Sequence, residues 1–468
     1  MTKNKIIFIL VVFSVFISVA YAAELIKAKE VSFSNGMSGL KANNVQDAIS
    51  ELYNKNISET SCKNVSVPKF GEGLIPVTID SDGTVTYADT SKEWYNYCDK
   101  RWANAVILEE GVNYKIGDII QESDIQSYFV WIPKYKYKLW NVDTPSKGIH
   151  DIEIVFDEND TTDVEGISCK TPMISGESGN CNNGEYMTHP AFISMNTNGF
   201  WVGKFETGYK GATSAATAQV NANDTSKIII KPNVYSWRNI TVYNSFLNSY
   251  NYQRGLDSHL MKSTEWGAAV YLSHSKYGKD YELSKNNNSA NITGYSALPS
   301  TNQQTYPATS GNGDTYNKPY NTETGYLAST TGNISGVYDM SGGAWEYVAS
   351  YMNGKLGSSG FTTTTIADYD SKYFDTYNAS STQTTYQYRI LGDATGEIGP
   401  FKSYLDGDNQ SRYHASWYGG LSIFIDSSWP WFRRGGNNGD GVLASSFYFC
   451  GNYGSASASG GYRIVLSP

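Results

Sequence analysis

From Tyr128 to the C-terminus, short aromatic runs alternate with long stretches of Asn, Ser, Thr and Gly, and this texture limits the folds open to the chain. Residues 278–321, for example, read GKDYELSKNNNSANITGYSALPSTNQQTYPATSGNGDTYNKPYN. Helical spacing is convincing in two places, Val242–Tyr252 and Thr264–Ser273. Ser263 is the expected N-cap of the second helix, with Glu265 in its first turn. We therefore expect a loop-rich, mostly β or α+β protein.

The composition excludes several other classes of protein. Charged residues make up only 17% of the 468, whereas there are 37 Tyr and 11 Trp. Disordered chains carry high charge and few aromatics, and coiled coils need Glu, Lys and Leu in bulk, so neither class fits. A net charge of −9 disfavours a nucleic acid as partner. A chain of this length is expected to hold two to four domains.

Residues 1–22 have the pattern of a secretory signal peptide. Lys3 and Lys5 precede the apolar run Ile6–Val19, and Ala20-Tyr21-Ala22 places small residues at the positions that signal peptidase reads. This predicts a secreted or cell-surface protein. The alternative is that the run, which is nearly long enough to span a bilayer, is kept as an anchor.

Residues 23–57 are expected to form a short strand–helix stalk. Val31 and Phe33 alternate like a strand, and Asn44 is placed to cap a helix that begins at Val45. The apolar residues at helical spacing are Val45, Ala48, Ile49 and Leu52. A helix this short is marginal alone. Either residues 31–53 therefore self-associate, or the helix docks on its own chain.

Residues 58–127 follow as a small β-rich region. Asp82-Gly83 is expected to form the turn between two alternating strands. The five cysteines suit an oxidising, extracellular environment. Two tentative disulfides are Cys62–Cys98, which flanks the hairpin, and Cys169–Cys181, which brackets a Gly/Ser/Asn loop. Cys450 is left without an assigned role.

Five segments, in order, carry a family resemblance. They are Phe129–Pro133 (FVWIP), Phe200–Glu206 (FWVGKFE), Ser263–Ala269 (STEWGAA), Gly336–Glu346 (GVYDMSGGAWE), and Arg434–Gly436 (RGG) paired with Gly461–Leu466 (GYRIVL). Together they resemble the formylglycine-generating-enzyme-like (sulfatase-modifying factor) domain, a variant of the C-type lectin fold, over residues 128–468. The resemblance implies core anchors at Trp201, Trp266 and Trp345. It also implies that Arg434 and Arg463 are buried, hydrogen-bonded supports.

The same resemblance bears on catalysis. Members that oxidise a sulfatase cysteine carry two cysteines shortly after RGG, and the matching positions here are Asp440 and Ser445. Neither residue binds copper as a thiolate. We therefore expect a protein that is not an enzyme. The alternatives are an oxidase of the formylglycine-generating type with an atypical site, and a structural tip of a phage or surface fibre.

Calcium is the one cofactor that the resemblance suggests. Family members bind it through an Asn, a Glu and backbone carbonyls near the Trp-Glu motif. Here Gly343 stands where the Asn is usual, and Glu346 remains as the metal ligand. The alternative is that Glu346 caps backbone amides.

Residues 437–460, NNGDGVLASSFYFCGNYGSASASG, contain no Lys, Glu, Gln, Met or Trp. Codons that end in a pyrimidine cannot encode these five types. The types present are all reachable from an Asn codon by changing its two adenines. The segment resembles the hypervariable region of target proteins of diversity-generating retroelements, which lies just ahead of the closing G-[FY]-R of a C-type lectin domain. The alternative is an ordinary Ser/Gly/Asn surface loop.

A randomised segment implies a binding function. Tyr, Ser, Gly and Asn dominate antibody paratopes, where Tyr supplies rigid contact area and the others supply adaptable hydrogen bonds. The expected contact residues are Asn437, Asn438, Asp440, Tyr448, Tyr453, Ser455, Ser457 and Ser459. Phe447 and Phe449 alternate with Tyr448 and should face the core. The partner would be a protein or glycan on another cell or phage.

Overall fold

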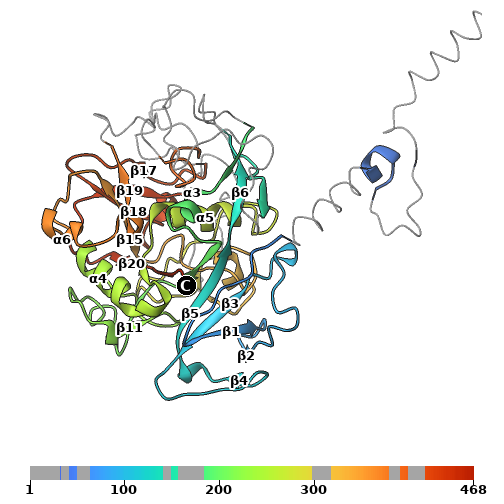
Figure 1. The fold of residues 1–468 in the computed structure, drawn as a ribbon, viewed down its shortest axis with the longest axis horizontal. Coiled ribbons are helices and arrows are strands. Elements are labelled where there is room, and N and C mark those ends of the chain that lie inside the picture. The colour runs from blue at the N-terminus through green and yellow to red at the C-terminus, as the bar shows by residue number, and fades with distance from the viewer. Residues whose placement is uncertain are drawn as a thin grey trace, which may run out of the picture. The chain divides into compact units, whose positions relative to one another are not determined.

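The computed structural model describes residues 32, 42–49, 64–140, 149–156, 184–297, 318–378, 390–398 and 417–468. The chain divides into two units, residues 1–63 and 64–468, and each is described by itself (Figure 1). Both helices and strands are present, with more strand than helix, which agrees with the expected mixed, mostly β or α+β class. No helix within the described ranges is long and apolar enough to cross a membrane. The predicted signal peptide lies outside these ranges, as do Leu52, Cys62, Cys169 and Cys181.

The first unit contains the predicted capped helix. Residues 45–49 are helical. The Asn44 side chain accepts a hydrogen bond from the backbone N–H of Asp47 at 2.8 Å, which confirms Asn44 as the cap. Ala48 is buried against Ala42, whereas Ile49 is 54% exposed.

An eight-stranded sheet forms the larger half of the second unit, and all its pairings are antiparallel. Its strands, in spatial order, are β12 (His259–Leu260), β21 (Ile464–Leu466), β9 (Gly199–Gly203), β5 (Ile125–Pro133), β3 (Asn104–Leu108), β1 (Leu74–Ile79), β2 (Val85–Tyr87) and β4 (Ile119–Ile120). β5 is the long central strand in Figure 1, and nearly every residue in it is buried. Its C-terminal half is the continuous apolar run FVWIP, which suits a strand that is buried on both faces.

The sheet runs across the boundary that we expected at residue 127. β3 pairs with β5 along most of its length, so β1–β4 extend the central sheet and are not a region apart. The hairpin within them is as predicted. Gly83 has a φ of +92°, which favours glycine, and its N–H donates to the Asp80 carbonyl at 2.8 Å.

A six-stranded sheet forms the second half. It comprises β16 (Asp375–Tyr377), β15 (Trp345–Met352), β18 (Trp431–Arg434), β19 (Phe449–Asn452) and β17 (Ser422–Ile423) in that order, with β20 (Gly460–Tyr462) also paired to β15. Smaller sheets are formed by β7 (Ile154–Phe156), β6 (Tyr135–Lys138) and β8 (Tyr186–Thr188), by β10 (Gly208–Tyr209) and β11 (Ile228–Ile229), and by β13 (Tyr295–Ser296) and β14 (Lys318–Pro319).

Four α-helices accompany the sheets in the described part of this unit: α3 (Pro190–Ser194), α4 (Val242–Tyr252), α5 (Ser263–Ser273) and α6 (Thr363–Ala367). The bounds of α4 are those predicted. α5 begins one residue early, so Lys262, not Ser263, is its N-cap. The reason is that Glu265 reaches back to accept the backbone N–H of Lys262 at 2.8 Å. α5 is buried along its whole length.

The aromatic core includes two of the three predicted anchors. Trp201 and Trp266 are fully buried. The Trp266 indole donates to the carbonyl of Ser446 at 2.8 Å, which ties α5 to the segment before β19. Trp345 is only half-buried, so its assignment as a core anchor is wrong.

Arg463 is the residue between β20, in the six-stranded sheet, and β21, in the eight-stranded one. It is fully buried, and its guanidinium donates to both carboxylate oxygens of Glu346 at 2.9 and 2.6 Å. It also donates to the carbonyls of Gly203 at 2.7 Å and Tyr338 at 2.9 Å. Arg434 is equally buried and donates to the carbonyls of Asp393 and Ala394. Both predicted supporting arginines are confirmed.

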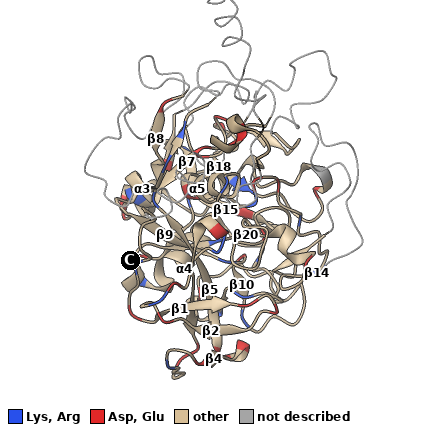
Figure 2. Cartoon of the chain, turned by 90° about the vertical axis from the view of Figure 1, so that its right-hand side faces the viewer, with Lys and Arg blue, Asp and Glu red and all other residues tan. Residues whose placement is uncertain are grey.

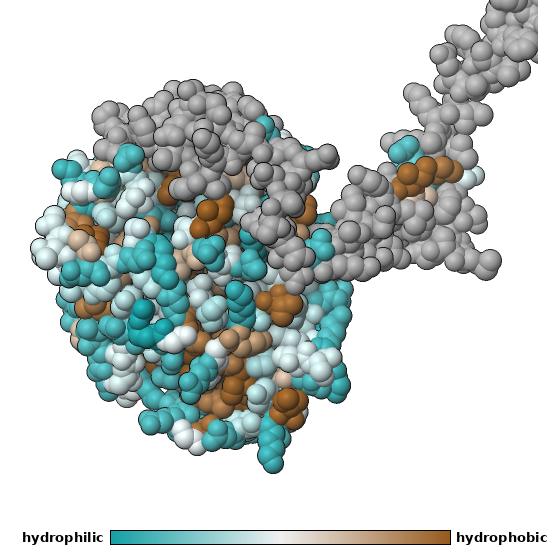
Figure 3. All heavy atoms as spheres, viewed as in Figure 1, coloured by the Kyte–Doolittle hydropathy of each residue, from teal (hydrophilic) through white to brown (hydrophobic). Residues whose placement is uncertain are grey.

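Charged residues are sparse along the ribbon (Figure 2). The fully buried ion pair between Arg463 and Glu346 is therefore an unusual feature of this protein. On the face shown in Figure 3, hydrophobic side chains form separate patches among polar ones. Scattered apolar residues of this kind are ordinary on a folded surface and by themselves mark no binding site.

We expect Arg463→Ala to lower the free energy of unfolding by about 3–5 kcal/mol, because it leaves the buried Glu346 carboxylate without its cation. Arg101→Ala is the matched control, since Arg101 pairs with Glu93 on the surface, where such a pair contributes at most about 1 kcal/mol. Urea unfolding of both variants, followed by tryptophan fluorescence, measures the difference. Equal losses would contradict the assigned role of Arg463.

Candidate functional site

The segment 437–460 leaves β18 through a glycine turn and passes through a short 3-10 helix, η7 (Gly441–Leu443), and β19 before it reaches β20. It has three parts. Residues 438–443, the outer turn, and residues 452–459, the outer loop, are mostly half-buried or exposed. Residues 444–451 are buried, and they are called the inner strand below because they lead into β19 and include its first three residues. The expectation of an exposed segment is therefore met at its two ends only.

The inner strand corrects one predicted contact residue. Tyr448 is fully buried and packs against Ile423 and Cys450, with partly buried Trp345, Leu421 and Trp429 over this cluster. Phe447 and Phe449 are buried, as predicted. Strand alternation does not apply at Tyr448, because this residue precedes β19 and its backbone N–H closes a turn onto the Ser445 carbonyl at 2.9 Å. An exposed Tyr448 is therefore a wrong prediction.

The outer turn is held by Asp440. Its Oδ2 accepts the backbone N–H of Asn437 at 2.9 Å and the indole N–H of Trp345 at 2.6 Å. Asn437 is only 8% exposed, since its side-chain oxygen accepts the N–H of Gly439 at 2.6 Å. Asn438 is half-buried, and no hydrogen bond engages its side chain within the described residues.

The outer loop presents the one strongly exposed aromatic residue of the segment. Tyr453 is 49% exposed, as predicted, and its ring stands perpendicular to that of Trp429 at 6.3 Å. Ser455, Ser457 and Ser459 are half-buried. The loop backbone is tied to β15, because the Tyr347 hydroxyl donates to the Ser455 carbonyl at 2.6 Å.

Trp345 connects the two exposed parts of the segment. Its backbone N–H donates to the Ser459 carbonyl at 2.8 Å, while its indole holds Asp440. The Arg433 guanidinium lies 3.7 Å from the Trp345 ring centroid, which is a close cation–π stack. Sequence reasoning missed both residues as site residues. The available signal was strand alternation, since a neighbour of the inward-facing Glu346 points to the other face.

Two consecutive glycines form the floor beside the outer turn. The N–H of Gly343 donates to the Asn286 carbonyl at 2.7 Å, and the Gly343 carbonyl accepts from the N–H of Asn438 at 2.9 Å. Gly343 has a φ of +68°, and a Cβ there would lie 2.1 Å from Glu206 Oε1. The Glu206 carboxylate is held in this position, because its Oε1 accepts a hydrogen bond from the N–H of Ala344 at 2.7 Å.

Glu346, the predicted calcium ligand, is engaged with Arg463. Both of its oxygens accept hydrogen bonds from the Arg463 guanidinium, and within the described residues no backbone N–H donates to them, so the alternative in which Glu346 caps backbone amides is wrong. Across the described ranges, no three His, Cys, Asp or Glu side chains are arranged to hold a metal. Ser445, one of the two positions matched to the oxidase cysteines, donates its hydroxyl to buried Glu282 at 2.9 Å.

The cysteines are described in part. Cys98 is disulfide-bonded, and its partner lies outside the described residues, as does the proposed pair Cys169–Cys181. Cys450 is a buried free thiol, 3.7 Å from the Arg433 guanidinium.

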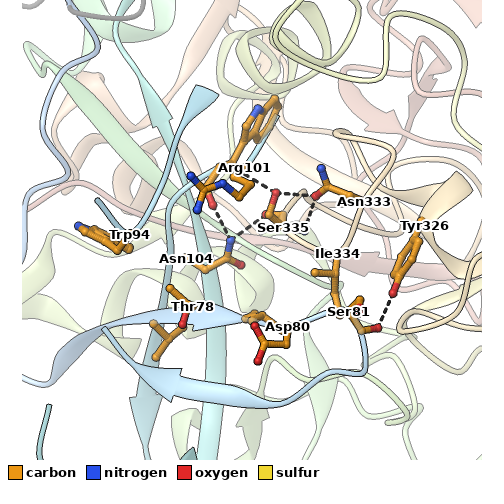
Figure 4. Close-up of a pocket in the computed structure, with 13 residues that line it drawn as sticks. Thr78, Asp80, Ser81, Trp94, Arg101, Asn104, Tyr326, Asn333, Ile334 and Ser335 are labelled. Atoms are coloured by element: carbon orange, nitrogen blue, oxygen red, sulfur yellow. Dashed lines mark hydrogen bonds between the residues drawn. The ribbon is translucent and has the colours of Figure 1, made fainter. Parts of the chain in front are cut away.

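A separate hollow of about 460 Å³ opens on the eight-stranded sheet and shares no residue with segment 437–460 (Figure 4). Trp94, Trp102 and Ile334 contribute apolar surface, and Asp80 and Arg101 lie at its polar edge. Some of the polar groups between them are hydrogen-bonded within the wall. For example, the Asn104 amide donates to the carbonyls of Trp102 and Ser335. Its size suits a small molecule, and the bond from Asn104 to Ser335 in its wall joins β3 to the 333–335 loop.

No family model matches the chain, and no curated protein matches it. Two solved structures show a weak likeness. Treponema denticola variable protein 1 is 11% identical over 63% of this chain and 91% of that chain, with a TM-score of 0.25. Major Tropism Determinant I1 Variant is 13% identical over 87% of this chain and 97% of that chain, with a TM-score of 0.22. Scores this low carry no conclusion about fold or function.

We expect Gly343→Ala to destabilise the protein more than Gly354→Ala. Both glycines have a φ near +70°, but a Cβ at Gly354 meets nothing within 4 Å. Gly354→Ala therefore measures the backbone cost alone, about 1–2 kcal/mol. Gly343→Ala adds the clash with Glu206. Thermal unfolding of the two variants separates the backbone cost from the cost of the clash. Equal losses of stability would show that Glu206 moves aside without a cost.

Proposed function

We propose that the protein is an exported, non-catalytic ligand-binding protein whose C-type-lectin-like domain presents a face rewritten by a diversity-generating retroelement. One observation carries the proposal. The segment that lacks five residue types divides into exposed ends around a buried strand, and its exposed ends meet at a Trp–Arg stack. A binding face needs variable exposed positions on a scaffold that does not change, and this arrangement offers both.

The proposed fold family, the formylglycine-generating-enzyme-like form of the C-type lectin fold, is supported by the convergence of its motif segments. Arg463, from the closing GYR, contacts Gly203 of FWVGKFE. It also contacts Tyr338 and Glu346, both from GVYDMSGGAWE. Segments that lie more than a hundred residues apart thus meet through the residues that carry the resemblance.

The proposed contact residues are revised by the structure. Tyr453, Asn437, Asn438, Asp440, Ser455, Ser457 and Ser459 remain, although Asn437 is only 8% exposed. Tyr448 is withdrawn, and Trp345 and Arg433 are added as an invariant platform between the two ends. The ligand would be a protein or glycan on another cell or phage. Residues 1–22 would direct export, and self-association through residues 31–53 would convert weak single-site binding into avidity.

The proposal predicts where substitutions are tolerated. Tyr453→Ala and Ser457→Ala should change the free energy of unfolding by less than about 0.5 kcal/mol, because these side chains are not packed in the core. Tyr448→Ala should lower it by about 3 kcal/mol or more, since it empties a buried site. Urea unfolding of each single variant gives these values.

The functional test uses two libraries of the full chain, displayed and selected against several unrelated proteins. One randomises Asn438, Tyr453, Ser455 and Ser457, and the other randomises residues 447–449. The first should yield folded binders to different targets, and the second should yield mostly unfolded chains. If the exposed library folds no better than the buried one, the segment is an ordinary part of the domain and the proposal fails.

A further inference from the structure

A small hollow adjoins the outer turn. Its volume is about 190 Å³, and it lies between Lys285–Asn287 on one side and Asn437–Gly439 with Gly441 on the other. The two sides are joined through Gly343, which accepts a hydrogen bond from Asn438 and donates one to Asn286. One wall therefore belongs to segment 437–460, and the other wall, Lys285–Asn287, lies outside that segment.

Lys285 is an unusual lining residue because it is buried without a partner. It is only 8% exposed, and its ammonium makes no hydrogen bond or ion pair with any residue that the structure describes. Lys204, by contrast, is a buried lysine whose ammonium has hydrogen-bond acceptors. Its ammonium, fully buried, donates to Asn104 Oδ1 and to the carbonyls of Ile334 and Gly336, at 2.7–2.9 Å. The Lys285 ammonium is not fully enclosed, so it is accessible from the hollow, where water or an anionic ligand supplies its acceptors.

The acidic groups near Lys285 are already engaged elsewhere. Glu282 accepts from the Ser445 hydroxyl and from the N–H and hydroxyl of Ser446 at 2.9–3.2 Å. Asp440 accepts from Trp345 and Asn437. Both acids raise the pKa of Lys285, but burial outweighs them and lowers it to about 8. Lys285 is therefore still mostly protonated at neutral pH.

Further donors line the same hollow. The Asn437 oxygen is used by the N–H of Gly439, and its amide nitrogen has no acceptor in the described part of the chain. The side chain of Asn438 is likewise unengaged there. An ammonium flanked by carboxamide nitrogens suits an anionic oxygen ligand. The volume corresponds to roughly six water molecules, which admits one small head group.

We propose that this hollow binds a carboxylate group of the ligand, with Lys285 as its fixed anchor. The inference rests on the proposed binding function and adds a chemical preference to it. Lys285 lies outside segment 437–460, so rewriting that segment leaves the anchor in place. Variants with different outer turns would then share a preference for acidic ligands, supplied either by an acidic sugar or by an acidic amino-acid side chain.

The test titrates the full chain by calorimetry with two acid–neutral pairs. Methyl glucuronoside against methyl glucoside probes the sugar source, and N-acetylglutamate α-amide against N-acetylglutamine α-amide probes the amino-acid source. At least one acid should bind about tenfold or more tighter than its neutral analogue, which corresponds to about 1.4 kcal/mol. Binding should weaken as the pH rises through the pKa of Lys285, since only the protonated amine attracts a carboxylate.

Two variants separate this anchor from a structural lysine. Lys285→Met keeps the length of the stem and removes the charge, so it should abolish the preference for the acid while the melting temperature is unchanged or higher. Lys355→Met, at an exposed lysine, should alter neither. Loss of folding in Lys285→Met, or an unchanged acid preference, would overturn the proposal. So would equal binding of acid and neutral compounds in both pairs.

Failure of this inference is distinguishable from failure of the proposed function. If the hollow ignores carboxylates but the exposed positions still accept substitution and yield binders, only the anchor is lost. If the acids bind but the exposed library does not fold, the hollow is a site on a domain without a diversified face.

Discussion

The chain passes from the six-stranded to the eight-stranded sheet at Arg463, and the ion pair of this residue with Glu346 fixes that crossing. Burial lowers the pKa of Arg463, but three buried carboxyl groups nearby, Glu346, Asp339 and Glu206, outweigh it and raise this pKa above its usual value. Burial raises the pKa of Glu206 well above its usual range, and the nearby Asp339 and Glu346 add to this. Without the guanidinium, the buried Glu346 carboxylate would lose the cation that holds both of its oxygens.

The proposed binding face depends on β15, the same strand that carries the Glu346 partner of Arg463. β15 turns Glu346 inward to Arg463 and places the neighbouring Trp345 outward between the two ends of segment 437–460. The Gly342-Gly343 turn that precedes β15 holds the outer turn through Asn438 and the scaffold wall through Asn286. In the proposed function, β15 therefore carries the fixed part of the face, and the exposed parts of segment 437–460 are the parts that vary. Lys285 belongs to that fixed part, because it lies on the wall that Asn286 anchors.

Features that depend on a short stretch of sequence were predicted well. α4 follows from its own periodicity, the turn at Gly83 from Asp-Gly between alternating strands, and the burial of Arg434 and Arg463 from their motifs. Features set by distant partners were not. Tyr448 is buried because Trp345 and Trp429 lie over it, and residues 64–127 join the main sheet because β3 pairs with β5. Lys285 carried no sequence signal, since its isolation exists only once its neighbours have found other partners.

The central claim is that the exposed ends of one segment are rewritten while its buried strand is kept. Sequencing the DNA on both sides of the gene tests it most directly. The account predicts a near-copy of the segment beside a reverse-transcriptase gene. In that copy, Asn codons should replace the codons of exposed residues such as Tyr453, Ser455 and Ser457, and the codons of the inner strand should be unchanged. The absence of such a copy, or a copy whose differences concentrate in residues 444–451, would contradict the claim.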